Sequence, residues 1–420
     1  MNYKQLYHNL IIIIIMACLG QAPVVLAAQP ESIRITWPLL ADAVNYELEI
    51  TDKSLPAGQT VAPARHVITD VTVPTTGTEL SGALLPKMAT LWWRVRAVDV
   101  QGQPLSDFTE SKHLSEGEIN PQAPLPVTTY PDELAVPLYP AYSWIPTLGA
   151  AGYDVEVLNL PLPTTERSQL GQQIAWYYVA GGDSFDCYDW HSYTIAGTYY
   201  WRVRAVNEFG QALGTWSACS AFTVTTQGYA VAALGDSVTH GGGAISSPPG
   251  TPIYDWTQSV TVPVKNLGHS GDTTDALIAR FDQDVLPFHP AILIIACGIN
   301  DIRDGTDASQ IINNLCVIKQ KCLARNITPI FVTLAPINPQ KIATIIGAPL
   351  PPQWQHNWRA VNAWILNQPN SVDTASLLKN AQGLLPDHLS ADGLHPDSEG
   401  KRVIGQAISQ KLFELQNASR

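Results

Sequence analysis

Residues 229–237 read YAVAALGDS, an apolar run of strand length that ends in glycine, aspartate and serine. Two more apolar runs, at residues 290–297 and 327–334, indicate further strands that are buried on both faces. Helical segments lie at residues 307–325, 353–367 and 397–415. Strands that alternate with helices predict a parallel sheet covered on both faces, so we expect a three-layer α/β domain over residues 227–420.

Small or polar residues follow the expected strands at three separate places. Ser237 follows the first strand directly, and Asn300 follows the strand at 290–297. Gly271 comes after a short strand that we expect at residues 262–264. Because functional groups in such sheets gather at the carboxyl ends of the strands, we expect these three residues to meet at one edge.

A serine, an aspartate and a histidine occur in an order that suits nucleophilic catalysis. Ser237 supplies a hydroxyl, and Asp392 and His395 lie just before the last helix. A histidine takes the proton of such a hydroxyl, and a carboxylate orients the histidine. The glycine–x–serine–x–glycine elbow is absent from the sequence around Ser237 and Ser270, which disfavours the α/β-hydrolase fold.

Four short blocks carry these residues. In chain order they are Gly235-Asp236-Ser237, Ser270-Gly271-Asp272, Gly298-x-Asn300-Asp301 and Asp392-x-x-His395-Pro396. With these blocks, residues 228–415 resemble the SGNH or GDSL hydrolase family. The first block departs from the family pattern at Val238, where leucine is usual, and we expect this position only to pack.

The resemblance implies a fold, a reaction and a site. The fold is a flavodoxin-like three-layer domain with a parallel sheet. The reaction is ester hydrolysis through an acyl-enzyme, with Ser237 as nucleophile, His395 as base and Asp392 as its partner. The implied oxyanion hole consists of the backbone N–H groups of Ser237 and Gly271 and the side-chain amide of Asn300.

Four polar residues close to the blocks have a simpler interpretation. Asp236 and Asp301 are expected to hold loops by accepting hydrogen bonds, as carboxylates after strands commonly do. His240 and His269 could line the pocket, but packing of the loops is the expected role for both.

The first half of the chain contains an internal repeat. LWWRVRAVD at residues 91–99 recurs as YYWRVRAVN at 199–207, and strands with Tyr46 and Tyr153 recur upstream of them. Alternating apolar and polar residues are typical of half-buried strands, so we expect two all-β sandwich modules. The expected modules span residues 28–118 and 119–226.

These modules resemble fibronectin type III domains. Between them, the proline-rich residues 121–131 are expected to be irregular, because proline interrupts both helices and strands. Tryptophans such as Trp93 and Trp201 are expected in the module cores. The aromatic residues at 176–178, and Tyr188 with Trp190, have an alternative role as an exposed surface for glycans.

Residues 1–27 have the pattern of an export signal. Lys4 precedes an apolar run, and Val25-Leu26-Ala27 suits cleavage. The run is interrupted before it reaches the roughly 20 apolar residues that a membrane span requires. We therefore expect a secreted or periplasmic protein with no membrane span in its mature form. Anchoring as a lipoprotein through Cys18 is the alternative.

Two cysteines of the first half of the chain suggest a disulfide. Cys187 and Cys219 lie in one expected module and are the best candidates for a disulfide in an oxidising compartment.

The net charge is -12, and dispersed Lys and Arg argue against nucleic acid as a partner. No cysteine–histidine pattern has zinc spacing, and we expect neither a metal ion nor another cofactor.

Export, accessory β-modules and the four blocks lead to three functional hypotheses. The first is an esterase that removes short acyl groups, specifically acetyl, from a carbohydrate such as an acylated polysaccharide. The second is a lipase or thioesterase that acts on longer acyl chains. The third is a glycan-binding or adhesion protein whose hydrolase domain is inactive and whose β-modules contact glycan or protein.

Overall fold

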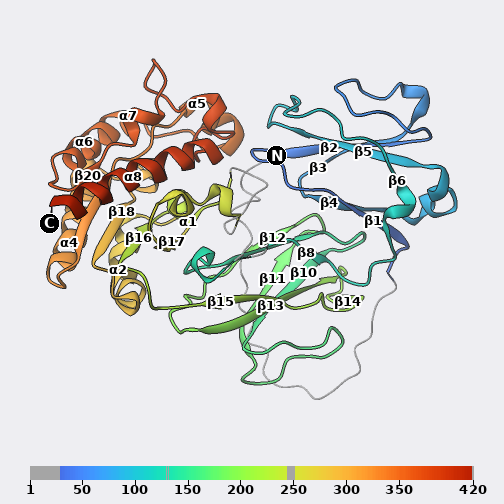
Figure 1. Cartoon of the computed structure of the whole chain (residues 1–420), viewed down its shortest axis with the longest axis horizontal. Helices are drawn as coiled ribbons and strands as arrows, with labels where there is room; N and C mark the ends of the chain where they lie inside the picture. The colour runs from blue at the N-terminus through green and yellow to red at the C-terminus, as the bar shows by residue number, and fades with distance from the viewer. Residues whose placement is uncertain (1–28, 129, 131, 244–250, 419–420) are drawn as a thin grey trace.

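The computed structural model describes residues 29–128, 130, 132–243 and 251–418. The predicted export signal, Cys18 and the stretch 244–250 lie outside the described residues. Among the helices of the described part, none combines the length and the apolar character needed to cross a membrane. Figure 1 shows two β-rich regions, in blue and green, beside a third region of helices and strands in yellow to red.

A five-stranded sheet forms the centre of the C-terminal region. Its strand order is β17-β16-β18-β19-β20, and every neighbouring pair is parallel. The strands are β16 Val231–Gly235, β17 Val264–Gly268, β18 Ile292–Ala296, β19 Thr328–Val332 and β20 Ser371–Val372. The predicted parallel sheet is therefore confirmed.

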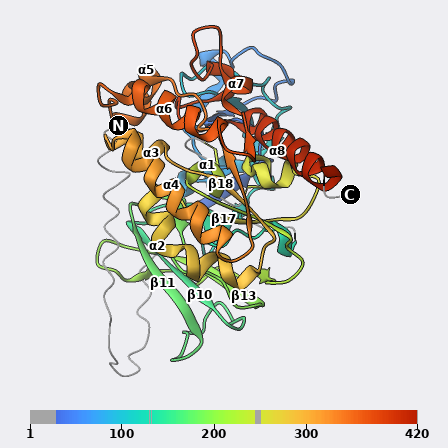
Figure 2. The same cartoon turned by 90° about the vertical axis from the view of Figure 1, so that its left-hand side faces the viewer.

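Helices cover both faces of this sheet, because alternate strand residues point to opposite sides. Ala232 and Leu234 of β16 join a core cluster with residues of α2, α4 and α6. Val231 and Ala233 join a second cluster with residues of α8. The helices are α1 Ser237–His240, α2 Thr274–Val285, α3 Ile299–Arg303, α4 Ala308–Leu323, α5 Pro339–Lys341, α6 Trp354–Leu366, α7 Ala375–Leu378 and α8 Ser398–Ala418. Figure 2 views the molecule from the side of this region, with α3 and α4 toward the reader.

The strand expected at residues 262–264 lies further along the chain. β17 runs Val264–Gly268, so it includes residues that the sequence assigned to a loop. The reason is that Lys265 and Asn266 are polar yet buried, which hides the strand from a hydropathy pattern. Each has a specific partner: Lys265 Nζ donates to Val136 O at 2.9 Å, and Asn266 Nδ2 donates to Thr239 O at 2.7 Å.

The first β-rich region contains two sheets, of order β4-β1-β7 and β3-β2-β5-β6. Its strands are β1 Ser32–Thr36, β2 Asn45–Thr51, β3 Val67–Val73, β4 Gly77–Ser81, β5 Trp92–Val98, β6 Lys112–His113 and β7 Glu118–Ile119. Residues of both sheets, including Ile33, Leu48 and Trp93, belong to one hydrophobic core.

The second β-rich region contains a sheet of order β11-β10-β13-β14, with β15 paired to β13, and a sheet of order β12-β9-β8. Its strands are β8 Leu125–Pro126, β9 Ala141–Ile145, β10 Gly152–Leu158, β11 Gln173–Ala180, β12 Asp186–Tyr188, β13 Gly197–Val206, β14 Ala212–Leu213 and β15 Ser220–Val224. Both sheets again share a core that includes Tyr142, Val155 and Trp201. The assignment of either region to the fibronectin type III type stays a prediction.

The sequence repeat is also a structural repeat. β2 pairs antiparallel with β5, and β10 pairs antiparallel with β13. In each pair a buried arginine of the later strand forms an ion pair with a buried glutamate of the earlier one. Arg94 Nε lies 2.7 Å from Glu49 Oε2, and the η2 nitrogen of Arg202 lies 2.6 Å from Glu156 Oε1.

Two expectations for the β-rich regions are wrong. Residues 121–131 are not wholly irregular, because Leu125–Pro126 forms β8 at the edge of its sheet, a place where proline is tolerated. Cys187 and Cys219 are both free thiols. Cys187 lies on β12, whereas Cys219 lies just before β15 of the other sheet and its Sγ donates to Leu162 O at 3.5 Å.

Candidate active site

Ser237 lies at the sharp turn between β16 and α1. Asp236 caps this short helix, because its Oδ1 accepts from the N–H of Val238 at 3.0 Å. Gly235 ends the strand where no side chain fits: a Cβ there would overlap Thr239 Oγ1 and lie 2.5 Å from Ala296 O. The local sequence therefore forces the chain to turn tightly and presents the serine at the carboxyl end of the sheet.

The structure brings Ser237, His395 and Asp392 together from opposite ends of the domain. Ser237 Oγ lies 2.9 Å from His395 Nε2, and His395 Nδ1 lies 2.7 Å from Asp392 Oδ2. Since a carboxylate only accepts, Nδ1 carries the proton and donates it to Asp392. The lone pair of Nε2 then faces the serine hydroxyl, which is the arrangement that a general base requires.

Asp392 is fully buried and firmly held. Its Oδ1 accepts from the backbone N–H groups of Leu394 and His395, both at 2.8 Å. Burial alone would raise the pKa of Asp392, but the charge and hydrogen bonds of His395 and the N–H of Leu394 bring that pKa below its ordinary value. Asp392 is therefore ionised at neutral pH and orients the imidazole.

Gly393 makes the Asp-Gly-Leu-His turn possible. Its φ of 79° is a conformation that other residues rarely adopt. A Cβ at this position would lie 2.6 Å from Lys341 Cβ and 2.7 Å from Asn338 O. The glycine thus lets Asp392 and His395 approach the segment at residues 338–341.

The loop after β17 carries Gly271 at the same edge of the sheet. Gly271 has a φ of 89°, and a Cβ built there would meet no atom of the described residues within 4 Å. Within the described part of the chain, the space beside its backbone is therefore open. Asp272 fixes the end of this loop through an ion pair with Arg280, at 2.6 Å, and a hydrogen bond with His269, at 2.7 Å.

Asn300 is buried and its amide is fixed in orientation. The amide oxygen accepts from the η1 nitrogen of Arg303 at 3.2 Å, and Nδ2 donates to Asp272 O at 2.9 Å. An amide nitrogen carries two protons, so this bond leaves one for a further acceptor. Asn300 therefore both holds the Gly271 loop and retains a donor.

Two buried charged groups hold the residue that follows the nucleophile. Asp236 accepts a hydrogen bond from the N–H of Val238, and Lys401 Nζ donates one to the carbonyl oxygen of Val238 at 2.6 Å. Burial raises the pKa of Asp236 to about 7, although the Val238 N–H opposes the shift. Burial lowers the pKa of Lys401 to about 8, opposed by carboxylates that include Asp255 and Asp236.

The remaining polar residues near the blocks bond to neighbouring loops. Asp301 accepts from the N–H of Thr274 at 2.9 Å. His240 is buried and bonds to Ser270, and His269 bonds to Asp272. Among the described residues, no group of three or more His, Cys, Asp or Glu side chains gathers as a metal ion would need.

Sequence reasoning missed the part of the site that comes from the second β-rich region. Tyr139, which the sequence did not single out, packs its ring edge-on against His269 at 4.6 Å between centroids. Trp190 does the same at 4.8 Å and is 51% exposed. The sequence singled out Trp190 only as part of a free aromatic surface. No sequence pattern links these residues to the loop, because the chain separates them by many elements.

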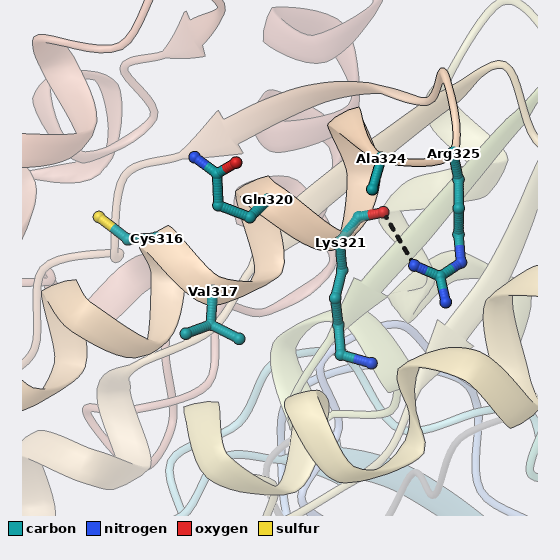
Figure 3. A pocket seen from close by; sticks show the side chains of 6 residues that line it. All are labelled: Cys316, Val317, Gln320, Lys321, Ala324 and Arg325. Carbon is teal, nitrogen blue, oxygen red and sulfur yellow. Dashed lines mark hydrogen bonds between the residues drawn. The ribbon is translucent and has the colours of Figure 1, made fainter.

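A hollow on helix α4 has no connection with these groups. Figure 3 shows its six lining residues, which are Cys316, Val317, Gln320, Lys321, Ala324 and Arg325. Its two cationic side chains are already paired with Asp282, at 2.6 Å and 2.5 Å. The hollow offers neither a nucleophile with a base nor a free charge, so we do not take it as the site.

Comparisons with known proteins concern the C-terminal region. Among similar solved structures are a G-D-S-L family protein from Desulfitobacterium hafniense and a GDSL-like lipase from Bacteroides thetaiotaomicron. A third is a catalytic mutant of an acetylxylan esterase from Geobacillus stearothermophilus. Their identities to this chain are 24%, 19% and 21%, and their TM-scores are 0.36, 0.36 and 0.33. The matches cover 44%, 45% and 43% of this chain, and 99%, 89% and 92% of the respective neighbours.

No curated protein matches this chain. A protein-family model does, over the residues that contain all four sequence blocks and the Ser237–His395–Asp392 arrangement. Residues 233–403 match the GDSL-like Lipase/Acylhydrolase family, so the C-terminal region of the chain contains a GDSL domain.

Proposed function

We propose that the protein is an exported serine esterase that removes acetyl groups from a carbohydrate. The observation that carries the proposal is the chain of hydrogen-bond distances from Ser237 through His395 to Asp392. It supports a nucleophile with a correctly oriented base. Export rests on the N-terminal sequence pattern, and fractionation of cells that express the whole chain tests it.

The proposed reaction has two halves. Ser237 Oγ attacks the ester carbonyl while His395 Nε2 takes the hydroxyl proton, and the same nitrogen then returns that proton to the departing alcohol. The carbonyl oxygen becomes negative and is held by the N–H groups of Ser237 and Gly271 and by Asn300 Nδ2. Each such donor typically lowers the barrier by about 3 kcal/mol. Water, activated by His395, hydrolyses the acyl-enzyme.

A short acyl group fits the exposure of the reacting groups. Ser237 is half-buried, and the His395 side chain is 23% exposed. A long acyl chain would have to bury many methylene groups at about 0.8 kcal/mol each to bind well. Gly271 adds open space beside the proposed oxyanion hole.

A sugar fits the aromatic residue beside the loop. Trp190 is half exposed, and its ring is held against His269, two residues from Gly271. Sugars present C–H groups that pack on aromatic rings, and the net charge of -12 suits a neutral polymer better than an acidic one. We propose Trp190 as a contact for the carbohydrate part of the ester.

The chemistry is tested with a fluorophosphonate probe and p-nitrophenyl esters. The wild type is expected to label, Ser237→Ala to lose the label, and hydrolysis to be fastest for acetate. A folded wild type that does not label would favour an inactive hydrolase domain. A rate that climbs from acetate to decanoate would favour the lipase or thioesterase reading.

The sugar contact is tested with one variant and two substrates. Trp190→Ala is expected to raise KM for an acetylated oligosaccharide. The KM for p-nitrophenyl acetate should stay within about twofold of the wild-type value. Phe209→Ala is the matched control, since Phe209 is another exposed aromatic residue of the second β-rich region. Equal effects of Trp190→Ala on both substrates would refute the contact.

A glycan-binding role of the second β-rich region is a second candidate, favoured by two aromatic side chains on one face of β11. Trp176 and Tyr178 are 37% and 42% exposed and lie two residues apart, so they point to the same side. Retention of wild type on insoluble polysaccharide, with loss in Trp176→Ala, tests this role.

A further inference from the structure

Residues 136–139 join the second β-rich region to the hydrolase domain: Val136 lies in the core of the first, whereas Leu138 and Tyr139 lie in a core of the second. The N–H of Leu138 donates to Asn266 O at 2.8 Å, beside the edge strand β17. Val136 O accepts from the buried Lys265 Nζ at 2.9 Å. Leu138 and Tyr139 are buried in the same core cluster as α2 and α4. The segment therefore covers an edge that the hydrolase domain would otherwise leave unpaired.

His240 connects this segment to the site. Its Nε2 lies 2.6 Å from the carbonyl oxygen of Tyr139, and since a carbonyl only accepts, Nε2 carries the proton. Its Nδ1 is then the acceptor for the N–H of Ser270, at 3.1 Å. Burial lowers the pKa of His240 to about 3, so the imidazole is neutral and keeps one tautomer across the working pH range.

The two ends of this imidazole bridge lie next to the proposed catalytic groups. His240 is the last residue of α1, the helix that Ser237 begins. Ser270 directly precedes Gly271, whose N–H is the proposed oxyanion donor. One neutral ring thus joins the nucleophile helix, the Gly271 loop and the second β-rich region. Figure 1 shows β12 of that region near α1, in agreement with the ring contact between Tyr188 and His240.

Tyr139 reinforces the bridge from the same side. Its hydroxyl donates to Asp284 Oδ2 at 2.7 Å, and the guanidinium of Arg280 lies over its ring at 5.6 Å. Arg280 is also the residue that pairs with Asp272 at the end of the Gly271 loop. Tyr188 of β12 packs its ring edge-on against His240 at 5.9 Å. The loop is therefore held against the β-rich region on several sides.

We propose that His240 and the Tyr139 carbonyl are positioning residues that fix the Gly271 loop in its oxyanion-binding conformation. The second β-rich region is then part of the active site and not a separable accessory. This inference rests on the proposed function for its link to catalysis, but the positioning of the loop is a physical property that stands apart from activity.

Two substitutions of His240 separate the two halves of the bridge. His240→Gln places an amide nitrogen near the position of Nε2 and keeps a donor for the Tyr139 carbonyl, but loses the acceptor for Ser270. His240→Asn places an oxygen near the position of Nδ1 and keeps the acceptor for Ser270, but no longer reaches Tyr139. His356→Gln, at an exposed position on α6, is the control.

The first readout is hydrogen–deuterium exchange of the peptide that contains residues 266–272. Both His240 variants are expected to exchange faster in this peptide than wild type and His356→Gln, while the other strands of the sheet keep their protection. This readout does not require activity, so it decides the positioning even if the protein is not an esterase. Unchanged exchange in both variants would overturn the proposal.

The second readout is the kinetics of p-nitrophenyl acetate hydrolysis. Both His240 variants are expected to lose roughly 10- to 100-fold in kcat with KM within about twofold, because a displaced oxyanion donor is missed only in the transition state. His356→Gln is expected to keep kcat and KM within about twofold of wild type. In an active wild type, faster exchange with unchanged kcat would overturn the proposal, whereas an inactive wild type would overturn the proposed function instead.

Discussion

Replacement of Asp392 by asparagine tests the proposed triad most directly, because the structure dictates how the new side chain must lie. Oδ1 of Asp392 accepts from two backbone N–H groups, those of Leu394 and His395, both at 2.8 Å. The amide oxygen must take this place, since an amide nitrogen would face two donors. The amide nitrogen is then left facing His395 Nδ1.

This orientation forces the imidazole into the wrong tautomer. Nδ1 must become an acceptor for the amide, so the ring proton moves to Nε2, which lies 2.9 Å from Ser237 Oγ. Nε2 can then no longer take the serine proton. A triad with this defect typically loses about 10,000-fold in kcat, which corresponds to about 5 kcal/mol of barrier.

The fold should survive the substitution, because both backbone hydrogen bonds to Oδ1 remain. The pKa of Asp392 lies below its ordinary value in the folded state, so its charge stabilises the fold above about pH 4 and this contribution is lost as the pH falls through the folded pKa. Asp392→Asn is therefore expected to be less stable than wild type at pH 7, with a difference that shrinks in acid.

The assay is kcat and KM for p-nitrophenyl acetate, together with the rate of fluorophosphonate labelling. Asp387→Asn is the matched control, because Asp387 is an exposed aspartate whose carboxylate pairs with Lys341, at 3.2 Å, instead of with a histidine. The control is expected to keep wild-type kinetics. A folded Asp392→Asn variant with less than a tenfold loss in kcat would refute the assigned role of the carboxylate.

Three further predictions concern the oxyanion site, a buried carboxyl and the cysteines. Asn300→Ala is expected to lower kcat by roughly 100- to 1,000-fold with little change in KM, and a rise in KM alone would contradict the oxyanion role. Asp236→Asn keeps a capping oxygen but removes a group whose folded pKa is about 7 and whose unfolded pKa is about 3.9. Because the folded carboxyl holds its proton more strongly, its contribution to stability is lost as the pH rises through about 7. The free energy of unfolding of Asp236→Asn, measured with denaturant, should therefore rise relative to that of wild type between pH 4 and 7, by at most about 1.4 kcal/mol per pH unit. A difference between the two proteins that does not change with pH would contradict this. Cys187 and Cys219 are expected to react with an alkylating agent in the denatured protein before any reductant is added. A disulfide-linked peptide that contains both cysteines would contradict their assignment as free thiols.

The sequence predicted the elements whose burial follows from their own composition. The runs that became β16, β18 and β19 are apolar along their length, so a local pattern reveals them. Gly235 was predicted as part of a short block, and the structure shows why glycine is required there: a Cβ would collide with neighbouring atoms. Gly393, which the block Asp392-x-x-His395 left unspecified, is required for the same reason. The order of strands along the chain was enough to predict that Ser237, Gly271 and Asn300 lie at one edge of the sheet.

The tertiary structure decided what depends on distant partners. The bounds of β17 were predicted wrongly because Lys265 and Asn266 are polar. They are buried because they form hydrogen bonds with other segments of the chain. The same holds for His240, whose role depends on the carbonyl of Tyr139 in another β-rich region. A sequence pattern indicates which side chains are usually buried. It does not indicate which distant backbone group forms the hydrogen bond that a buried polar side chain needs. For this protein the sequence alone predicted the proposed reacting groups and the sheet that carries them, whereas only the folded chain showed which neighbouring region contacts the loops beside those groups.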